Sequence, residues 1–265
     1  MANKTTSDAT RRMCENAKTL GFQPDRLILL DKRLAEWSKN VMTPSIAVKV
    51  LRHGQVAFEG AYGISGKDKE PDSLTADTIF PVASITKPVV ATLLAIMQEE
   101  GLVDFYHPVR EYLPEFTGDP DNLVRVWHLL SHSSGIIDSD IHRLFDEHVR
   151  QSLGLAFPAD EEPPEAWNAL FLKIREKMGL PYMEPSAAMH RNTNLVTGLS
   201  FPPTHKPQEV MAYCSFGYDM AMEIITRISG ERIDEYASRK LFKPLGMNDS
   251  HFIFPREKLP RYVTR

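Results

Sequence analysis

The segment from Phe80 to Gly101 constrains the fold most, because it joins a dense apolar pattern to clear start and stop signals. Its apolar side chains would cover nearly the whole circumference of a helix, which is typical of a helix buried in a core. These residues are Val89, Val90, Leu93, Leu94, Ile96 and Met97. Pro88 suits a first helical turn, and Gly101 suits a left-handed stop. We therefore expect a buried helix that begins close to Ser84.

Ser84 and Lys87 form an S-x-x-K pattern at the start of this expected helix. Residues three apart share one helix face, so the Lys87 amine can reach the Ser84 hydroxyl. A serine becomes a useful nucleophile when a partner removes its proton, and the positive end of a helix favours developing negative charge. The pattern is weak by itself, since a capping serine beside a surface lysine would look the same.

Composition sets the class of protein and excludes several partners. The chain has 265 residues, of which 42% are hydrophobic and 25% charged, as expected for a soluble globule of one large domain or two small ones. A net charge of −4 gives no reason to expect a nucleic-acid partner. The sequence has neither a signal-like apolar stretch at its start nor a run of about 18 apolar residues, so we expect a cytoplasmic protein without a membrane partner.

Cysteine and histidine spacing predicts neither disulfides nor a metal centre. Cys14 and Cys214 are too few for a disulfide framework, and we expect both to be reduced thiols. The nearest group of histidines has no cysteine partner and no H-E-x-x-H spacing. It consists of His128, His132, His142 and His148. We expect no metal and no cofactor.

Several other elements can be predicted from local patterns. Residues 45–52 and 55–62 are β-rich runs joined by His53-Gly54, which indicates a hairpin. Helices are expected at 25–40, 124–132, 167–178, 215–229 and 233–242, and a strand at 251–254. Residues 138–212 carry proline-rich stretches on both sides of one amphipathic helix, and we interpret them as an insertion that shapes a pocket or lid.

Tyr213 precedes a helix for which Ser215 is a plausible N-cap and Gly230 the stop. A tyrosine hydroxyl at a helix N-terminus and near a lysine ammonium has a lowered proton affinity, so it can act as a base or a proton relay. Tyrosine in this position is also common as simple packing. Spacing alone does not choose between the two.

Five ordered blocks together resemble the serine β-lactamase and penicillin-binding-protein superfamily. They read FPVASITKPVVATLLAIMQEEGLV, YLPEF, HLLSHSSGI, AYCSFGYDMAMEIITRISG and LFKPLGMNDSHF. The resemblance covers roughly residues 41–255. It is strongest to the class C-like branch, which includes class C β-lactamases, D-amino-acid-specific peptidases and β-lactamase-like esterases. It is specific because all five blocks occur in order.

The resemblance implies an α+β, β-lactamase/transpeptidase-like fold, in which 1–265 is one domain with an antiparallel sheet from its terminal segments and a helical region. It also implies two-step acyl transfer. Ser84 would be the acylated nucleophile, Lys87 its activating neighbour and Tyr213 the hydroxyl that shuttles the proton. Ser215 stands where the family's Tyr-x-Asn motif has Asn, so it would bind substrate through a hydroxyl. The substrate would be a small ester or amide, with an esterase favoured by the expected cytoplasmic location.

The family's third motif, a Lys-Thr-Gly or His-x-Gly triad on a sheet strand, does not follow Tyr213. That strand would supply a second oxyanion N–H, whose loss costs about 2.7–4 kcal/mol, or roughly 10²–10³ in turnover. We therefore expect the chain to lack C-terminal sheet strands and to be a fragment of a longer protein, poorly active and prone to self-association. The alternative is a catalytically weak binding or scaffold protein of the same fold. An α/β-hydrolase is disfavoured because the sequence has no G-x-S-x-G.

Overall fold

The computed structural model describes residues 17–39, 43–66, 73–116, 118–159, 161, 163–178 and 202–264. The chain divides into two compact units, each described by itself below. The first is Met1–Val82 together with Phe254–Arg265, and the second is Ala83–Ile253. None of the helices in the described part of the chain is both long and apolar enough to cross a membrane.

The first unit is built on a hairpin of β1 (Ser45–Arg52) and β2 (Gln55–Gly63), as predicted. The strands are antiparallel, with Arg52 opposite Gln55. The two residues between them, His53 and Gly54, have φ values of 52° and 73°. Positive φ at both turn residues matches the right-handed twist of the strands, so this turn fixes the register.

Helix α2 (Pro24–Trp37) packs against β2 in the same unit. Leu34 of α2 and Phe58 of β2 are both buried. A polar contact adds to this packing, because the Tyr62 hydroxyl donates to the Asp31 carboxylate at 2.6 Å. Among the described residues the sheet has two strands, and a ribbon of two strands is marginal without such packing.

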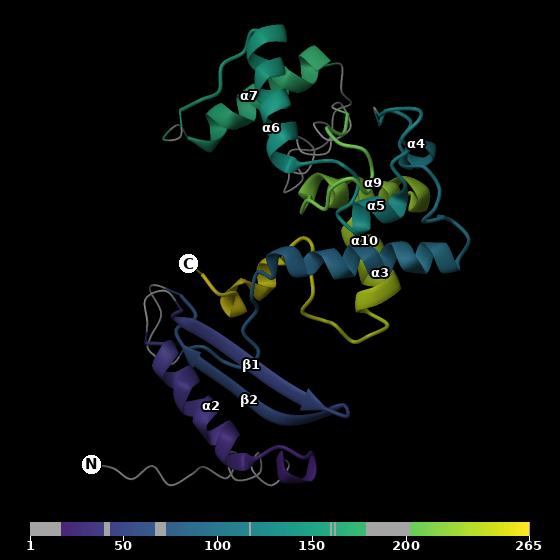
Figure 1. Ribbon diagram of the computed structural model, residues 1–265. Helices are drawn as coiled ribbons and strands as arrows, with labels where there is room; N and C mark the ends of the chain where they lie inside the picture. The colour runs from purple at the N-terminus through teal and green to yellow at the C-terminus, as the bar shows by residue number, and fades with distance from the viewer. Residues whose placement is uncertain are drawn as a thin grey trace. The chain divides into compact units, whose positions relative to one another are not determined.

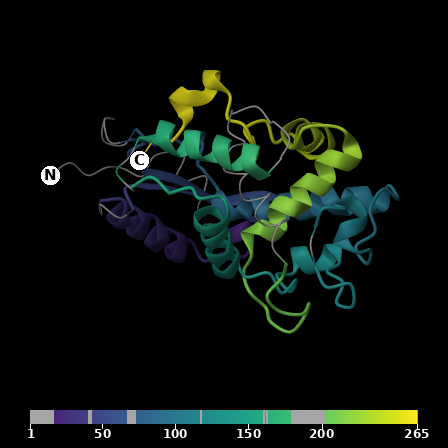
Figure 2. The ribbon, with the colours of Figure 1, turned by 90° about the horizontal axis from the view of Figure 1, so that it is seen from above.

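The second unit is helical. Its α-helices are α3 (Thr86–Glu99), α4 (Val109–Tyr112), α5 (Val126–Leu130), α6 (Asp138–Glu147), α7 (Pro164–Met178), α9 (Ser215–Ser229) and α10 (Ile233–Ala237). Helix α9 packs on both α3 and α5; it lies over α3 in Figure 1 and crosses it when seen from above in Figure 2. The stacked helices enclose the main core.

Helix α3 confirms the expectation of a buried helix. Val90, Leu93, Leu94 and Met97 are buried in the main core, whereas Val89 and Ile96 are partly buried at its edge. The helix ends at Gly101, whose φ is 74°. There the Gly101 N–H donates to the Gln98 carbonyl at 3.0 Å and the Leu102 N–H to the Met97 carbonyl at 2.9 Å. This pair of bonds is the Schellman stop that a glycine at this position favours.

Helices α6 and α7 contribute to a second, smaller core, formed by Phe145, Val149, Leu170 and Ile174. This cluster lies within the region 138–212, so that region has apolar packing of its own. The side chains of Trp167, Phe171 and Met178 lie outside the described set, as do residues 179–201.

Two predictions for the C-terminal part of the unit need correction. The helix expected at 233–242 is divided into α10 and a π-helical turn, Ser238–Phe242. The strand expected at 251–254 is wrong, because these residues form bends and irregular chain. Phe252 instead stacks its ring on Phe242, with centroids 6.2 Å apart. A β-rich run becomes a strand only when another strand pairs with it, and this one makes side-chain contacts instead.

Candidate active site

Ser84 lies where a 3-10 turn, Ala83–Ile85, leads into α3. Its side chain is exposed, at the N-terminal end of a helix whose middle turns are buried in the core. The preceding residue, Ala83, has a φ of 45°. Left-handed backbone costs a non-glycine residue about 1 kcal/mol or more, and such strain is concentrated at functional sites. The local backbone thus holds the serine in a turn that relaxed chain would avoid.

Lys87 follows in the first turn of α3, and its Nζ donates to Ser84 Oγ at 3.3 Å. The S-x-x-K pattern therefore produces the contact that helix spacing predicts. The same ammonium lies 4.5 Å from the centre of the Tyr213 ring and 5.4 Å from that of Tyr218. Two aromatic rings surround the cation, and this cation–π attraction limits where the amine can move.

Tyr213 joins this pair from a distant part of the sequence. Its hydroxyl donates to Ser84 Oγ at 2.6 Å, a contact between residues 129 positions apart. Hydrogen bonding with Lys87, and then with Ser84, lowers the pKa of Tyr213 below its ordinary value of 10.0. The ring is 55% exposed, so substrate can reach the hydroxyl. The structure thus brings together the three residues that the sequence selected as catalytic.

The chain around Tyr213 is held by the segment 132–135. The Ala212 N–H donates to the His132 carbonyl at 3.0 Å, and the Cys214 N–H donates to His132 Nδ1 at 3.1 Å. The His132 ring packs on the Tyr213 ring with centroids 4.6 Å apart. Sequence reasoning missed this role, because it considered His132 only as a metal ligand. Its place in the HLLSHSSGI block was the available signal.

Gly135, at the end of this segment, packs closely against the backbone of residues 205–208. Its φ is 78°, and a Cβ added to it would lie 2.0 Å from the His205 carbonyl oxygen. The His205 N–H donates to the Gly135 carbonyl at 3.2 Å, and the Gln208 N–H donates to that of Ser133 at 2.8 Å. Glycine is therefore needed for both the backbone angle and the close approach.

Ser215 differs from expectation, because Cys214 is the N-cap of α9 and Ser215 is its first residue. Cys214 has extended backbone, and its Sγ accepts the Gly217 N–H at 3.3 Å. The Ser215 N–H donates to the Asp138 carboxylate, at 3.0 and 2.8 Å from its two oxygens, and the Ser215 side chain is exposed. Asp138, which the sequence did not single out, therefore satisfies a donor at the start of α9.

The four histidines considered as a group have separate surroundings. His128 is buried, and its Nδ1 accepts the Arg125 N–H at 2.9 Å. The His142 ring packs on Phe216, with centroids 5.0 Å apart. Within the described ranges no three His, Cys, Asp or Glu side chains are grouped as a metal site would require.

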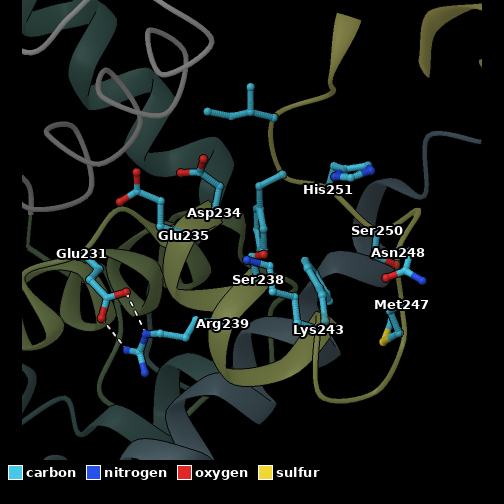
Figure 3. Close-up of a pocket in the computed structure, with 13 residues that line it drawn as sticks. Glu231, Asp234, Glu235, Ser238, Arg239, Lys243, Met247, Asn248, Ser250 and His251 are labelled. Atoms are coloured by element: carbon cyan, nitrogen blue, oxygen red, sulfur yellow. Dashed lines mark hydrogen bonds and ion pairs between the residues drawn. The ribbon is translucent and has the colours of Figure 1, made fainter. Parts of the chain in front are cut away.

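A cavity of about 510 Å³ lies elsewhere in the second unit, between α10 and the chain that follows it. Figure 3 shows its charged lining, in which Arg239 pairs with Glu231 at 3.1 Å. Neither Ser84, Lys87 nor Tyr213 lines it. These three residues therefore lie outside this cavity.

The sequence of the chain is similar to those of several known proteins. A 91-residue alignment to the esterase EstB of Burkholderia gladioli has 34% identity and covers 33% of this chain and 23% of that protein. An N-acetylmuramyl-L-alanine amidase of Bacillus subtilis is 24% identical over 244 residues, or 87% of this chain and 47% of that protein. The chain thus spans about half the length of the amidase.

Solved structures share the fold. The octameric penicillin-binding protein homologue from Pyrococcus abyssi matches with a TM-score of 0.60 and 24% identity, over 88% of this chain and 46% of that one. A class C β-lactamase in complex with cefoxitin matches with a TM-score of 0.57 and 20% identity, over 94% of this chain and 55% of that one. These matches confirm the β-lactamase/transpeptidase-like α+β fold. The family model for Beta-lactamase matches residues 30–265, and the chain belongs to this family.

Proposed function

We propose that this chain carries the nucleophile and proton-transfer groups of a serine hydrolase that forms an acyl-enzyme on small esters. The observation that carries the proposal is the convergence on Ser84 Oγ of the Tyr213 hydroxyl at 2.6 Å and Lys87 Nζ at 3.3 Å. A nucleophile within hydrogen-bond reach of its base, with a third group orienting that base, is the arrangement that activates serine.

In the proposed reaction, Tyr213 as phenolate accepts the Ser84 hydroxyl proton while Oγ attacks the ester carbonyl. The tetrahedral intermediate then collapses, its C–O bond to the leaving group breaks, and Tyr213 returns the proton to the departing alkoxide. Water then attacks the acyl-enzyme and gives a proton to Tyr213. The bond between the acyl carbon and Ser84 Oγ breaks, and Tyr213 returns that proton to Oγ, which releases the acid and restores Ser84. The lowered pKa of Tyr213 supports this role, because it brings the base form closer to the working pH.

Lys87 supplies the charge that makes this possible. Its ammonium near the Tyr213 ring and Ser84 Oγ stabilises a phenolate and then an alkoxide, and it needs no proton transfer of its own. Ser215, exposed at the start of α9, is proposed to bind substrate through its hydroxyl. We propose that residues 138–212 shape the pocket, since Asp138 at one end contacts Ser215 and Ala212 at the other end is bonded to His132.

Small esters are the proposed substrates for two reasons. Ser84 is exposed and Tyr213 is half exposed, so the described residues offer little enclosure to fix a large substrate. Ile85 and Met211, close to these residues in sequence, expose 68% and 77% of their surface and would favour an apolar acyl group. The similarity to an esterase supports this choice, whereas the similarity to an amidase supports amides as a second substrate class.

The alternative is a catalytically weak binding or scaffold protein of the same fold. Hydrolysis of 4-nitrophenyl acetate separates the two functions. We expect a burst of nitrophenolate equal in amount to the protein, followed by slow turnover. Ser84→Ala should abolish the burst, and Ser131→Ala, which removes an exposed hydroxyl bonded to Trp127, should leave it intact. A burst that is absent from the wild-type chain, or equal in all three proteins, would favour the scaffold.

A further inference from the structure

His132 contacts three consecutive residues centred on Tyr213. Its carbonyl accepts the Ala212 N–H at 3.0 Å, its ring packs on Tyr213 at 4.6 Å, and its Nδ1 accepts the Cys214 N–H at 3.1 Å. One residue therefore holds the residue on each side of the tyrosine as well as the tyrosine ring. A second ring, that of Tyr218 in α9, lies 5.4 Å from the imidazole.

The backbone of His132 is itself unusual, with a φ of 57°. Histidine is one of the few non-glycine residues enriched in this left-handed region, together with asparagine and aspartate. The bonds that continue this pairing, from Gln208 to Ser133 and from His205 to Gly135, hold the segment in place. Several contacts together therefore hold His132 in its strained backbone conformation, as is usual where such strain persists.

The contact with Cys214 also fixes the protonation state of the ring. A backbone N–H can only donate, so Nδ1 must present its lone pair, and the ring proton of a neutral imidazole must then be on Nε2. Protonation would place a second donor opposite the Cys214 N–H and break the bond. It would also add a positive charge beside the Lys87 ammonium.

We propose that His132 is the positioning residue for Tyr213, and that it holds the tyrosine hydroxyl on Ser84 only as a neutral imidazole with an unprotonated Nδ1. This rests on the proposed function, in which Tyr213 exchanges a proton with Ser84. His132 does not touch the substrate in this account. It acts by fixing the tyrosine, whose hydroxyl must stay within hydrogen-bond reach of Oγ.

The charged and titratable groups around His132 favour the neutral form. Lys87 on α3 opposes a charge on the ring and Asp138 on α6 favours one. The other titratable neighbours are Tyr213, Cys214 and Tyr218. Burial, and then Lys87, lower the pKa of His132 below 6.5. The neutral form is therefore present at neutral pH and is lost as the pH falls through this lowered pKa.

Two substitutions distinguish the role of His132 as a hydrogen-bond acceptor for the Cys214 N–H from the role of its imidazole ring. His132→Gly removes both and tolerates the left-handed backbone, whereas His132→Asn also tolerates that backbone and offers an amide oxygen to the Cys214 N–H but cannot titrate. His53→Asn is the matched control, because His53 also has left-handed backbone, with a φ of 52°, and lies in the turn of the hairpin. Circular dichroism and thermal unfolding establish that all three variants are folded before their rates are compared.

The first readout is the rate of Ser84 acylation by a 4-nitrophenyl ester as a function of pH. We expect His132→Gly to lower this rate about 10²-fold at neutral pH with little change in KM, as a misplaced catalytic group does. We expect His132→Asn to recover most of the rate. Both proteins should keep the pH dependence set by Tyr213, but His132→Asn should lack the additional fall that the wild type shows at acid pH, where His132 becomes protonated. A His132→Gly rate within about threefold of the wild type and the control, or an unchanged acid limb in His132→Asn, overturns the proposal.

The second readout does not require catalysis, so it distinguishes failure of this inference from failure of the proposed function. Nitrogen-15 NMR of the wild type should show His132 with its proton on Nε2, and carbon-13 at Tyr213 Cζ should report a pKa below 10.0. In His132→Gly that pKa should rise toward 10.0, because the tyrosine leaves Lys87 and Ser84. A proton found on Nδ1, or an unchanged Tyr213 pKa in His132→Gly, refutes positioning by His132 whether or not the ester is hydrolysed.

Discussion

The Asp138 carboxylate accepts the backbone N–H of Ser215 with both of its oxygens, at 3.0 and 2.8 Å. Asp138 is the first residue of α6, and Ser215 is the first residue of α9. One negative side chain therefore lies at the N-termini of two helices, where their dipoles and free N–H groups favour it. This contact joins the helix that follows Tyr213 to the start of the region 138–212.

Replacing Asp138 should destabilise the N-terminus of α9. We expect Asp138→Ala to lower the free energy of unfolding by about 1 kcal/mol, as the loss of a helix cap does, and Asp138→Asn to cost less. Asp140→Ala is the control, because Asp140 is also in the first turn of α6 but accepts the Thr204 hydroxyl at 2.9 Å. Urea unfolding measures both, and amide exchange at Ser215 should accelerate only in the Asp138 variants. Equal exchange in the control would refute the contact.

Two glycines with similar backbone angles should respond differently to alanine. Gly135 and Gly101 have φ values of 78° and 74°, but a Cβ at Gly135 meets the His205 carbonyl oxygen at 2.0 Å, whereas one at Gly101 has nothing within 4 Å. Gly101→Ala should lower the free energy of unfolding by about 1 kcal/mol, from strain alone. Gly135→Ala should cost clearly more, since backbone must shift. Thermal unfolding of the pair decides the point, and equal losses would contradict it.

Much of the fold was predictable because its signals are local. The His53-Gly54 turn fixes the hairpin, and the apolar pattern that ends at Gly101 fixes α3. The strand expected at 251–254 was wrong because strand formation depends on a partner that local sequence does not reveal. The N-cap of α9 was wrong by one residue, since a cysteine sulfur makes the capping contact.

The residues of the candidate site were harder to predict from local sequence patterns than the helices and the hairpin. S-x-x-K spacing predicted the contact between Ser84 and Lys87, but Tyr213 reaches Ser84 only because α3 packs on α9. The order of motif blocks, not any single spacing, selected Tyr213. His132 and Asp138 were missed because they accept the backbone N–H groups of Cys214 and Ser215. Nearly every residue has a backbone N–H, so the residue types at 214 and 215 do not reveal such a contact.

Lys87 and Tyr213 should act as one proton-transfer unit. Lys87→Ala and Tyr213→Phe are each expected to lower the rate of Ser84 acylation severely, by about 10²-fold or more, because each removes part of the activation of one hydroxyl. The double variant should be little slower than the slower single variant. Pre-steady-state nitrophenolate release measures all four proteins. Mild effects that multiply fully in the double variant would mean that the two residues only pack against each other.

The rate of acylation should also rise with pH. The pKa of Tyr213 is lowered from 10.0 by its hydrogen bond with Lys87 first and Ser84 second, so its base form appears as the pH rises through a value below 10.0. Lys87→Met should move this midpoint upward, since it removes the larger cause. The pH–rate profiles of the two proteins test this expectation. A midpoint that is the same in both would contradict the assignment of Tyr213 as the base.

The most direct test of the account is to find which residue becomes acylated. The wild-type chain is treated with a fluorophosphonate, its intact mass is measured, and the modified peptide is identified. We predict one adduct per chain, on the peptide that contains Ser84, and no adduct on Ser84→Ala. An adduct that persists in Ser84→Ala, or one that maps to another serine, would contradict the central claim.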